Sequence, residues 1–134
     1  MADPIGIASG IAGLVTLAWQ IVNLSHSYIS DVKSADRSRR RFEQELLALT
    51  SILLQAEEVS QDAESLGLVT HRPAALSANV VSESHVQLLE LRSELQKHSS
   101  KLIWPFREKE MRKHVDALQR ISAIFSAFLT SNVL

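Results

Sequence analysis

PIGIASGIAGLVTLAWQIVNLSHSYIS, residues 4–30, contains no Asp, Glu, Lys or Arg, and this uncharged stretch decides the fold. An α-helix of this length measures about 40 Å, whereas about 20 apolar residues span the hydrocarbon core of a bilayer. The stretch therefore predicts a helix that is either buried in a bundle or placed in a membrane. It is not typical of a secretory signal peptide, because no Lys or Arg precedes it and Asp3 is acidic.

Small and weakly polar residues form one stripe along this predicted helix. They recur at steps of three and four, which places them on one face: Gly6, Ser9, Gly13, Thr16, Gln20, Asn23 and Ser27. Apolar residues occupy the broad remaining face, so we expect the stripe to let neighbouring helices approach closely. Gly6, Gly10 and Gly13 are the candidate packing residues, although a single GxxxG spacing is a weak signal in a stretch rich in Gly and Ala. The residues alone favour a buried bundle helix over a membrane role.

Three further helices are predicted, at residues 34–66, 78–103 and 105–130, with a loop at 68–77. In each helical segment apolar residues recur at steps of three and four. The expected core positions are Phe42, Leu46, Leu47, Leu49, Ile52, Leu53, Leu54 and Ala56, then Val81, Leu88, Leu91, Leu95 and Leu102, then Met111, Val115, Leu118, Ile121, Ser122, Ile124, Phe125, Phe128 and Leu129. We expect a single all-α domain over residues 1–134, a four- or five-helix bundle with a long apolar N-terminal helix at residues 1–30.

Several residues mark the expected ends of these helices. Gly67 is a candidate C-cap, and Ser77 is a candidate N-cap for the third helix. Pro105 fits the first turn of the fourth helix, where its missing N–H costs nothing. Trp104 and Phe106 flank this proline, and we expect them to fix one helix end against the core rather than to anchor a partner.

Composition and motifs argue against an enzyme. Lys and Arg number 14 against 15 Asp and Glu, and this balance argues against a nucleic-acid binder, which usually needs a basic excess. Cys is absent, which excludes disulfides, thiolate metal sites and a cysteine nucleophile. The sequence has no HExxH, phosphate-loop or GxSxG motif. Glu110 with His114 does not complete a metal site, and we expect both residues at the surface. We expect no catalytic residue, no cofactor and no metal.

A basic segment follows the uncharged stretch and consists of Lys33, Arg37, Arg39, Arg40 and Arg41. One interpretation is a flank that binds anionic lipid headgroups beside an inserted helix. The other is a solvated helix face, on which Arg39–Glu43 and Arg41–Glu45 form i, i+4 pairs. Taken alone the segment favours the second interpretation, and the uncharged stretch before it favours the first.

Three segments resemble the N-terminal HeLo-like (HELL) domain of fungal STAND receptors. They are MADPIGIASGIAGL (1–14), YISDVK (28–33) and LIWPFREK (102–109), at matching spacings. The resemblance implies an effector domain that normally stands in front of a NACHT-type NTPase module in an intracellular receptor. It also implies kinship with HeLo domains and with the four-helix bundle of the mixed-lineage kinase-like pseudokinase, which trigger regulated cell death by attacking membranes. In HeLo-type proteins the N-terminal helix is the membrane-targeting element.

Together, the residues and the resemblance predict a cell-death effector that oligomerises on activation and moves from the cytoplasm to the plasma membrane. The expected membrane-inserting residues are Ile5, Ile7, Ile11, Leu14, Val15, Leu17, Trp19, Ile21 and Val22. The expected partners are anionic phospholipids, other copies of the chain and an attached receptor module, and nucleic acid is not among them. The alternative is a homotypic adaptor that assembles receptor complexes or filaments without membrane insertion. Its function would lie in exposed charges such as Lys109, Arg112 and Lys113.

Overall fold

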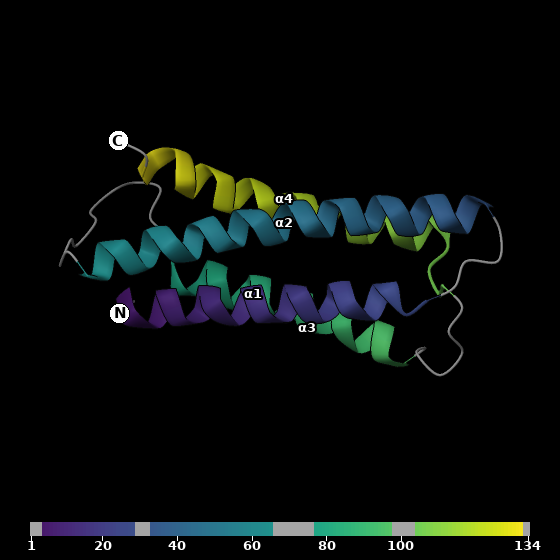
Figure 1. The fold of residues 1–134 in the computed structure, drawn as a ribbon, viewed down its shortest axis with the longest axis horizontal. Helices are drawn as coiled ribbons and strands as arrows, with labels where there is room; N and C mark the ends of the chain where they lie inside the picture. Colours follow the sequence, from purple (N-terminus) through teal and green to yellow (C-terminus); the bar gives the residue numbers. More distant parts are fainter. Residues whose placement is uncertain (1–3, 29–32, 66–76, 98–103, 133–134) are drawn as a thin grey trace.

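The computed structural model describes residues 4–28, 33–65, 77–97 and 104–132, with side-chain surroundings for 7–28, 37–62, 77–97 and 104–130. These residues form four α-helices and no strand: α1 (Pro4–His26), α2 (Lys33–Ser65), α3 (Ala78–Lys97) and α4 (Glu108–Asn132). Successive helices run antiparallel, so the start of α1 and the end of α4 lie at the same end of the molecule (Figure 1). The expected all-α bundle with a long apolar N-terminal helix is confirmed, with four helices in the described residues.

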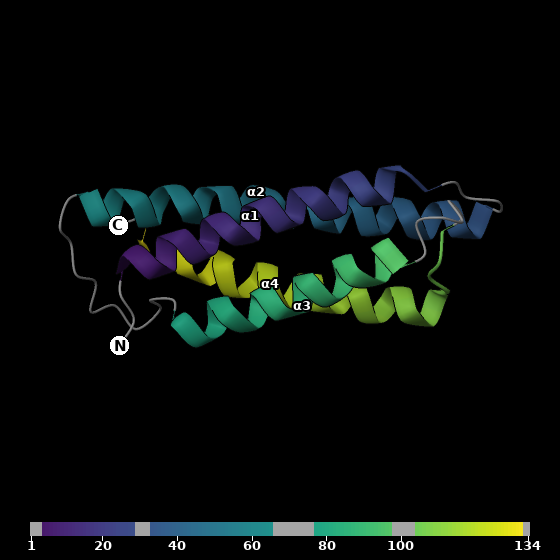
Figure 2. The same cartoon turned by 90° about the horizontal axis from the view of Figure 1, so that it is seen from below.

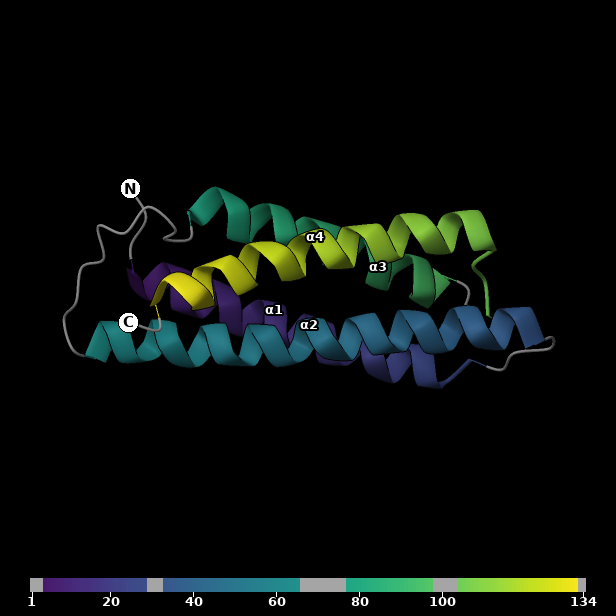
Figure 3. The same ribbon diagram turned by 90° about the horizontal axis from the view of Figure 1, so that it is seen from above.

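The helices are arranged in two layers. α1 and α2 form one layer, and α3 and α4 form the other, as the two side views show (Figures 2 and 3). α1 packs closely against α2 and α3, and α2 packs closely against α4, whereas α3 and α4 contact each other only sparsely. α3 therefore depends mainly on α1 for its place in the bundle.

All four helices and the segment before α4 contribute to one continuous core. From α1, the side chains of Ile11, Leu14 and Ile21 are fully buried in it. Removing one such side chain from water contributes roughly 1.5–3 kcal/mol, so the apolar face of α1 is a large part of what stabilises the bundle.

The polar stripe of α1 faces solvent. Ser9, Thr16, Gln20 and Asn23 are exposed, and the expectation that the stripe packs against neighbouring helices is wrong for these four residues. The physical reason is that α1 packs closely against α2 and α3, and its least apolar side is the one that these helices leave in water.

The predicted core positions on the other helices are largely confirmed. On α2, for example, Phe42 and Leu53 are fully buried, and on α4 Phe125 is fully buried. Three predicted positions are wrong, because each helix contacts its partners over a narrower arc than its apolar stripe: Leu47, Leu54 and Ile124 are 43%, 42% and 41% exposed. Leu102 lies outside the described residues.

α1 ends at His26, earlier than the expected residue 30. The N–H groups of Ser27 and Tyr28 donate to the carbonyls of Leu24 and Ser25, three residues back instead of four, which closes the last turn. Tyr28 leaves the helical path and its side chain is buried.

The start of α3 is as predicted, and the start of α4 is not. The N–H of Val80 donates to Ser77 Oγ at 3.1 Å, so Ser77 caps α3. Trp104 and Phe106 are both buried against the core, as expected, and this keeps Pro105 in the connecting segment instead of the first turn of α4. α4 begins at Glu108. In its first turn the N–H of Met111 donates to the carbonyl of Arg107, four residues back, at 2.8 Å. Gly67 and the loop before Ser77 lie outside the described residues.

Candidate membrane-targeting helix

α1 is the candidate functional element because its residues Ile7–His26 are long and apolar enough, by length and composition alone, to cross a membrane. The core helix of a soluble protein passes the same test, so the side-chain positions matter more than the composition. Six of the expected membrane-inserting residues are buried in the bundle: Ile11, Leu14, Val15, Leu17, Ile21 and Val22. Ile7 is half-buried, and the side chain of Ile5 lies outside the described surroundings.

Trp19 differs from the other expected membrane-inserting residues because 44% of it is exposed. It lies on the solvent side of α1 together with Thr16, Gln20 and Asn23. An indole ring has a large apolar surface, which favours lipid over water. α1 therefore carries one large apolar residue on its accessible side.

Of the two glycines on α1 whose surroundings are described, Gly10 makes the closer contact with another helix. A Cβ atom built on Gly10 would lie 2.8 Å from Val81 Cγ1 on α3, so glycine is what allows α1 and α3 to approach at this point. A Cβ atom on Gly13 would lie 3.9 Å from His85 Cε1, which is an ordinary contact distance. The surroundings of Gly6 lie outside the described part of the chain. The close approach at Gly10 is made within this chain, to α3.

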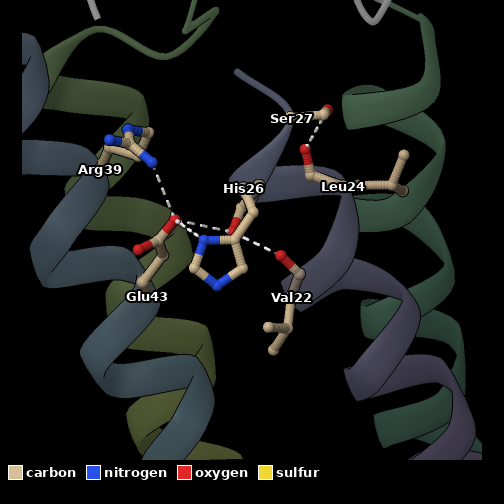
Figure 4. A network of polar contacts seen from close by, with 7 residues as sticks. Val22, Leu24, His26, Ser27, Arg39 and Glu43 are labelled. Atoms are coloured by element: carbon tan, nitrogen blue, oxygen red, sulfur yellow. Dashed lines mark hydrogen bonds and ion pairs between the residues drawn. The ribbon is translucent and has the colours of Figure 1, made fainter. Parts of the chain in front are cut away.

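A polar cluster joins the last turn of α1 to α2 (Figure 4). We call Ser25, His26, Arg39 and Glu43 the Glu43 cluster, because each of the other three contacts Glu43 Oε1. Ser25 Oγ donates to it at 3.2 Å, Arg39 Nη1 donates at 3.1 Å, and His26 Nδ1 lies 3.5 Å away. Ser25 is fully buried, and its hydroxyl also lies 3.0 Å from the carbonyl oxygen of Val22. This cluster attaches the C-terminal end of α1 to the rest of the molecule.

A second polar contact attaches the middle of α1 to α3. Arg92 Nη1 donates to Gln20 Oε1 at 2.5 Å on the surface of the bundle. Since Gln20 belongs to the polar stripe, part of that stripe has a structural role that does not require burial.

The basic segment at the start of α2 is divided between two roles. The side chain of Arg39 is 19% exposed and pairs with Glu43, as the solvated-face interpretation predicted. Glu45, the other expected partner, accepts a hydrogen bond from Gln119 of α4 at 3.0 Å. Arg37, Arg40 and Arg41 are exposed, whereas the side chain of Lys33 lies outside the described surroundings. The accessible basic surface therefore consists of three arginines, without Arg39.

Tyr28 and Trp104 belong to an aromatic cluster that sequence reasoning found only in part. The Trp104 ring lies 5.7 Å from Tyr28, 5.4 Å from Phe42 and 5.3 Å from Phe106, measured between ring centroids. The hydroxyl of Tyr28 donates to the carbonyl of Leu95 on α3, and burial raises the pKa of Tyr28 above its ordinary value of 10.0. The buried Trp104 Nε1 has no hydrogen-bond partner among the described residues. The position of Trp104 and Phe106 beside a proline was the available signal, and Tyr28 stood out only as the first residue of the YISDVK segment, with no indication that it joins the core.

His114 was expected at the surface, and this expectation is wrong. Its side chain is 15% exposed, its ring lies 4.5 Å from that of Phe106, and its Nε2 lies 3.2 Å from Glu94 Oε2 on α3. Burial lowers the pKa of His114 below its ordinary 6.5, although the charge of Glu94 acts in the opposite direction. Sequence periodicity could not indicate this contact, because Glu94 and His114 lie on different helices.

The exposed side of α4 carries the charges considered for an adaptor. Lys109, Arg112, Lys113, Asp116, Gln119, Arg120 and Ala123 line a shallow depression there. Arg112 pairs with Glu108 at 3.2 Å, with both side chains more than three-quarters exposed, so this pair contributes little to stability. Within the described parts of the chain, no group of three or more His, Asp or Glu side chains is placed to hold a metal ion.

Comparison with known proteins identifies a family for this chain. A family model described as the N-terminal region of pigment biosynthesis cluster protein PigL matches residues 2–101, a span that includes α1, α2 and α3. No curated protein and no solved structure matches the chain.

Proposed function

We propose that this chain, which belongs to the family of the PigL N-terminal domain, is a cell-death signalling domain that oligomerises on activation and targets membranes through α1. In the resting state α1 is held in the bundle, in the cytoplasm. Activation through an attached receptor module, such as a NACHT-type NTPase, brings copies together and releases α1 into the plasma membrane. The domain acts without catalysis. The resemblance of its sequence to HeLo-like domains supports this role.

The observation that carries the proposal is the position of α1. Within the described residues it is the helix of membrane length, and it packs closely against α2 and α3. The described polar contacts that attach it to other helices are the Glu43 cluster and the Gln20–Arg92 hydrogen bond. Release of α1 requires the loss of these polar contacts as well as of its apolar contacts in the core.

The energetic balance of release is plausible. The apolar side chains of α1 would move from the interior of the protein to lipid, so their removal from water would be retained. The polar stripe would then face other copies or a water-filled pore, because an isolated polar group facing lipid is costly. Oligomerisation and insertion are therefore coupled in this proposal.

Vesicle leakage tests the insertion step with a charge placed on the exposed side of α1. In the resting bundle, Trp19→Lys puts the ammonium group into water, whereas in a membrane it lies near the middle of the span Ile7–His26. A lysine there costs about 2.5–3.5 kcal/mol on insertion scales. We expect wild-type chain to release dye from vesicles containing anionic phospholipid, and Trp19→Lys to be at least tenfold less active.

The matched control is Ser93→Lys, which adds the same charge at an exposed position on α3. Circular dichroism and urea unfolding should show that both variants remain folded. Wild-type chain that leaves the vesicles intact, or a Trp19→Lys variant as active as Ser93→Lys, would contradict insertion of α1. Leu14→Lys is unsuitable here, because Leu14 is fully buried and the variant would lose the fold for other reasons.

The basic segment has its own test. Charge reversal at Arg37, Arg40 and Arg41 should weaken co-sedimentation with anionic vesicles, most clearly at low ionic strength, because the three guanidinium groups are exposed. Reversal at Lys109, Arg112 and Lys113 on α4 alters the same number of charges on another surface. If the two triple variants weakened co-sedimentation equally, the three arginines would contribute only as general surface charge.

A homotypic adaptor without membrane insertion is the second candidate function. The observation in its favour is the charged depression lined by α4 residues, which is open to a partner. Under this alternative α1 stays in the bundle throughout. Lipid flotation separates the two candidates, because an adaptor polymerises without lipid and does not float with vesicles.

A further inference from the structure

α2 has a side that no helix covers within the described part of the chain. It packs against α1 and α4, and its remaining surface belongs to the outer face of the α1–α2 layer, the layer nearest the viewer in Figure 1. We define the α2 outer face by Arg40, Leu47, Leu54 and Glu58, all exposed. Steps of seven and eighteen residues correspond to about two and five full turns, so these four side chains share one side of the helix.

Trp19 of α1 lies beside this face. Glu43 contacts Ser25 and His26, which fixes the register between the two antiparallel helices. Trp19 lies two turns before His26, so it is level with the part of α2 two turns after Glu43, between Leu47 and Leu54. The centre of the surface therefore carries three large apolar side chains, Trp19, Leu47 and Leu54, each more than two-fifths exposed, together with the exposed Ser51.

The two ends of this surface carry opposite charges. The first part of α2 carries the exposed Arg37 and Arg40, whereas the last described part carries the exposed Glu58 and Asp62. The apolar centre lies between them. Rotation by 180° about an axis near residue 50 exchanges the basic and the acidic end and returns the apolar centre to its own position.

We propose that the α2 outer face binds a second copy of this chain, with the two α2 helices antiparallel. Leu47 of one copy lies near Leu54 of the other, with both Trp19 rings at the sides of this apolar centre. Arg40 comes opposite Glu58 of the other copy, and Arg37 comes opposite Asp62. Each pairing occurs twice, as a two-fold symmetric interface requires.

The charge pattern favours a second copy over a lipid surface. A flat anionic membrane would attract Arg37 and Arg40 and repel Glu58 and Asp62 on the same face. An inverted copy of the face offers an opposite charge at both ends and an apolar patch in the middle. Complementary charges of this kind set orientation and register more than they set affinity.

This inference deepens the self-association step of the proposed function, and its test uses no lipid, so either can fail while the other holds. Sedimentation velocity of the full chain at about 100 μM should give a dimer, since a Kd in the micromolar range is saturated there. Leu47→Asp should weaken the dimer at least tenfold. Ile124→Asp, which alters an equally exposed apolar residue on α4, should leave it unchanged.

A charge exchange tests the orientation. Arg40→Glu and Glu58→Arg should each weaken the dimer severalfold, because each places like charges opposite one another. The double variant restores both pairings and should recover most of the affinity. A chain that is monomeric at this concentration overturns the proposal, and if Leu47→Asp then also reduced vesicle binding, a membrane would be the occupant of the face. A dimer indifferent to Leu47→Asp, or a double variant weaker than either single one, overturns it equally.

Discussion

At the scale of the residue, Gly10 and Gly13 show how one residue type serves different purposes on a single helix. Both interrupt α1 with a residue of poor helix propensity, which costs about 1 kcal/mol each relative to alanine. At Gly10 the lack of a side chain is required, because Val81 of α3 occupies the space where a Cβ would lie. At Gly13 the corresponding space beside His85 is open enough for a methyl group.

The two glycines should therefore respond to alanine with opposite signs. Gly13→Ala should raise the free energy of unfolding by about 0.5–1 kcal/mol through helix propensity. Gly10→Ala gains the same term but forces the stiff β-branched Val81 away from α1, an overpacking cost of about 1–3 kcal/mol, so we expect no gain or a net loss. Urea unfolding of both variants measures the difference. A Gly10→Ala variant as stable as Gly13→Ala would show that the α1–α3 contact adjusts without cost.

At the scale of the element, the Glu43 cluster connects the end of one helix to the side of another. One carboxylate oxygen receives contacts from Ser25, His26 and Arg39, so its loss affects three groups at once. Ser25 keeps its hydrogen bond to the Val22 carbonyl, and Arg39 retains some exposure to water. Removal of the carboxylate should loosen the end of α1 without unfolding the bundle.

Glu43→Ala should lower the free energy of unfolding by about 1–2 kcal/mol, since it removes charge-assisted hydrogen bonds that are partly buried. Hydrogen exchange should accelerate most in the last turns of α1. Gln44→Ala, at the exposed neighbouring position, is the control. Under the proposed function, Glu43→Ala should also increase vesicle leakage. If hydrogen exchange across α1 were unchanged in Glu43→Ala, the Glu43 cluster would have no role in holding that helix.

The helices themselves could be predicted from sequence, but their exact exposure could not. Apolar residues such as Phe42, Leu46 and Leu53 recur at helical spacing, and that pattern identifies both the helix and its inward side. Leu47 and Leu54 follow the same spacing and lie in water, because the pattern does not say how wide an arc the neighbouring helices cover. The start of α4 was missed for a similar reason, since burial of Trp104 and Phe106 determines the path of Pro105.

The candidate site was predictable in its apolar part and not in its polar part. Residues such as Leu14 and Ile21 stand out in an uncharged stretch, and both are buried in α1. The partners Glu43 and Arg92 lie on other helices, so only the three-dimensional arrangement brings them to Ser25 and Gln20. Sequence periodicity describes one helix at a time, and contacts between helices lie beyond it.

At the scale of the whole molecule, α3 and α4 meet through few contacts, and the pair His114–Glu94 is one of them. Phe106 covers the imidazole ring, and Lys113 and Glu110 lie close enough to influence its charge. Because burial lowers the pKa of His114, the imidazole is neutral near pH 7, and Glu94 accepts a hydrogen bond from it instead of facing a full positive charge.

Acidification should therefore destabilise the fold through His114. The folded state binds a proton less readily than the unfolded chain, whose histidine pKa is near 6.5, so stability falls as pH drops below 6.5 and levels off below the folded pKa. His114→Gln should flatten the pH dependence of the unfolding free energy in this range. Glu94→Gln should steepen it, because it removes the charge that opposes the shift. Parallel stability curves for all three proteins between pH 7.5 and pH 5 would contradict this account.

The sparse contact between α3 and α4 has a consequence for any event that removes α1 from the bundle. Such an event would also remove the principal neighbour of α3. It would leave α2 packed in parallel with α4, and it would expose the Val81, Leu88 and Leu91 side chains of α3 to water. The exposed apolar side of α3 would favour association, and every other molecule that has released α1 exposes the same surface. Release of α1 and association of the remaining helices with other copies would then be cooperative, because each process favours the other.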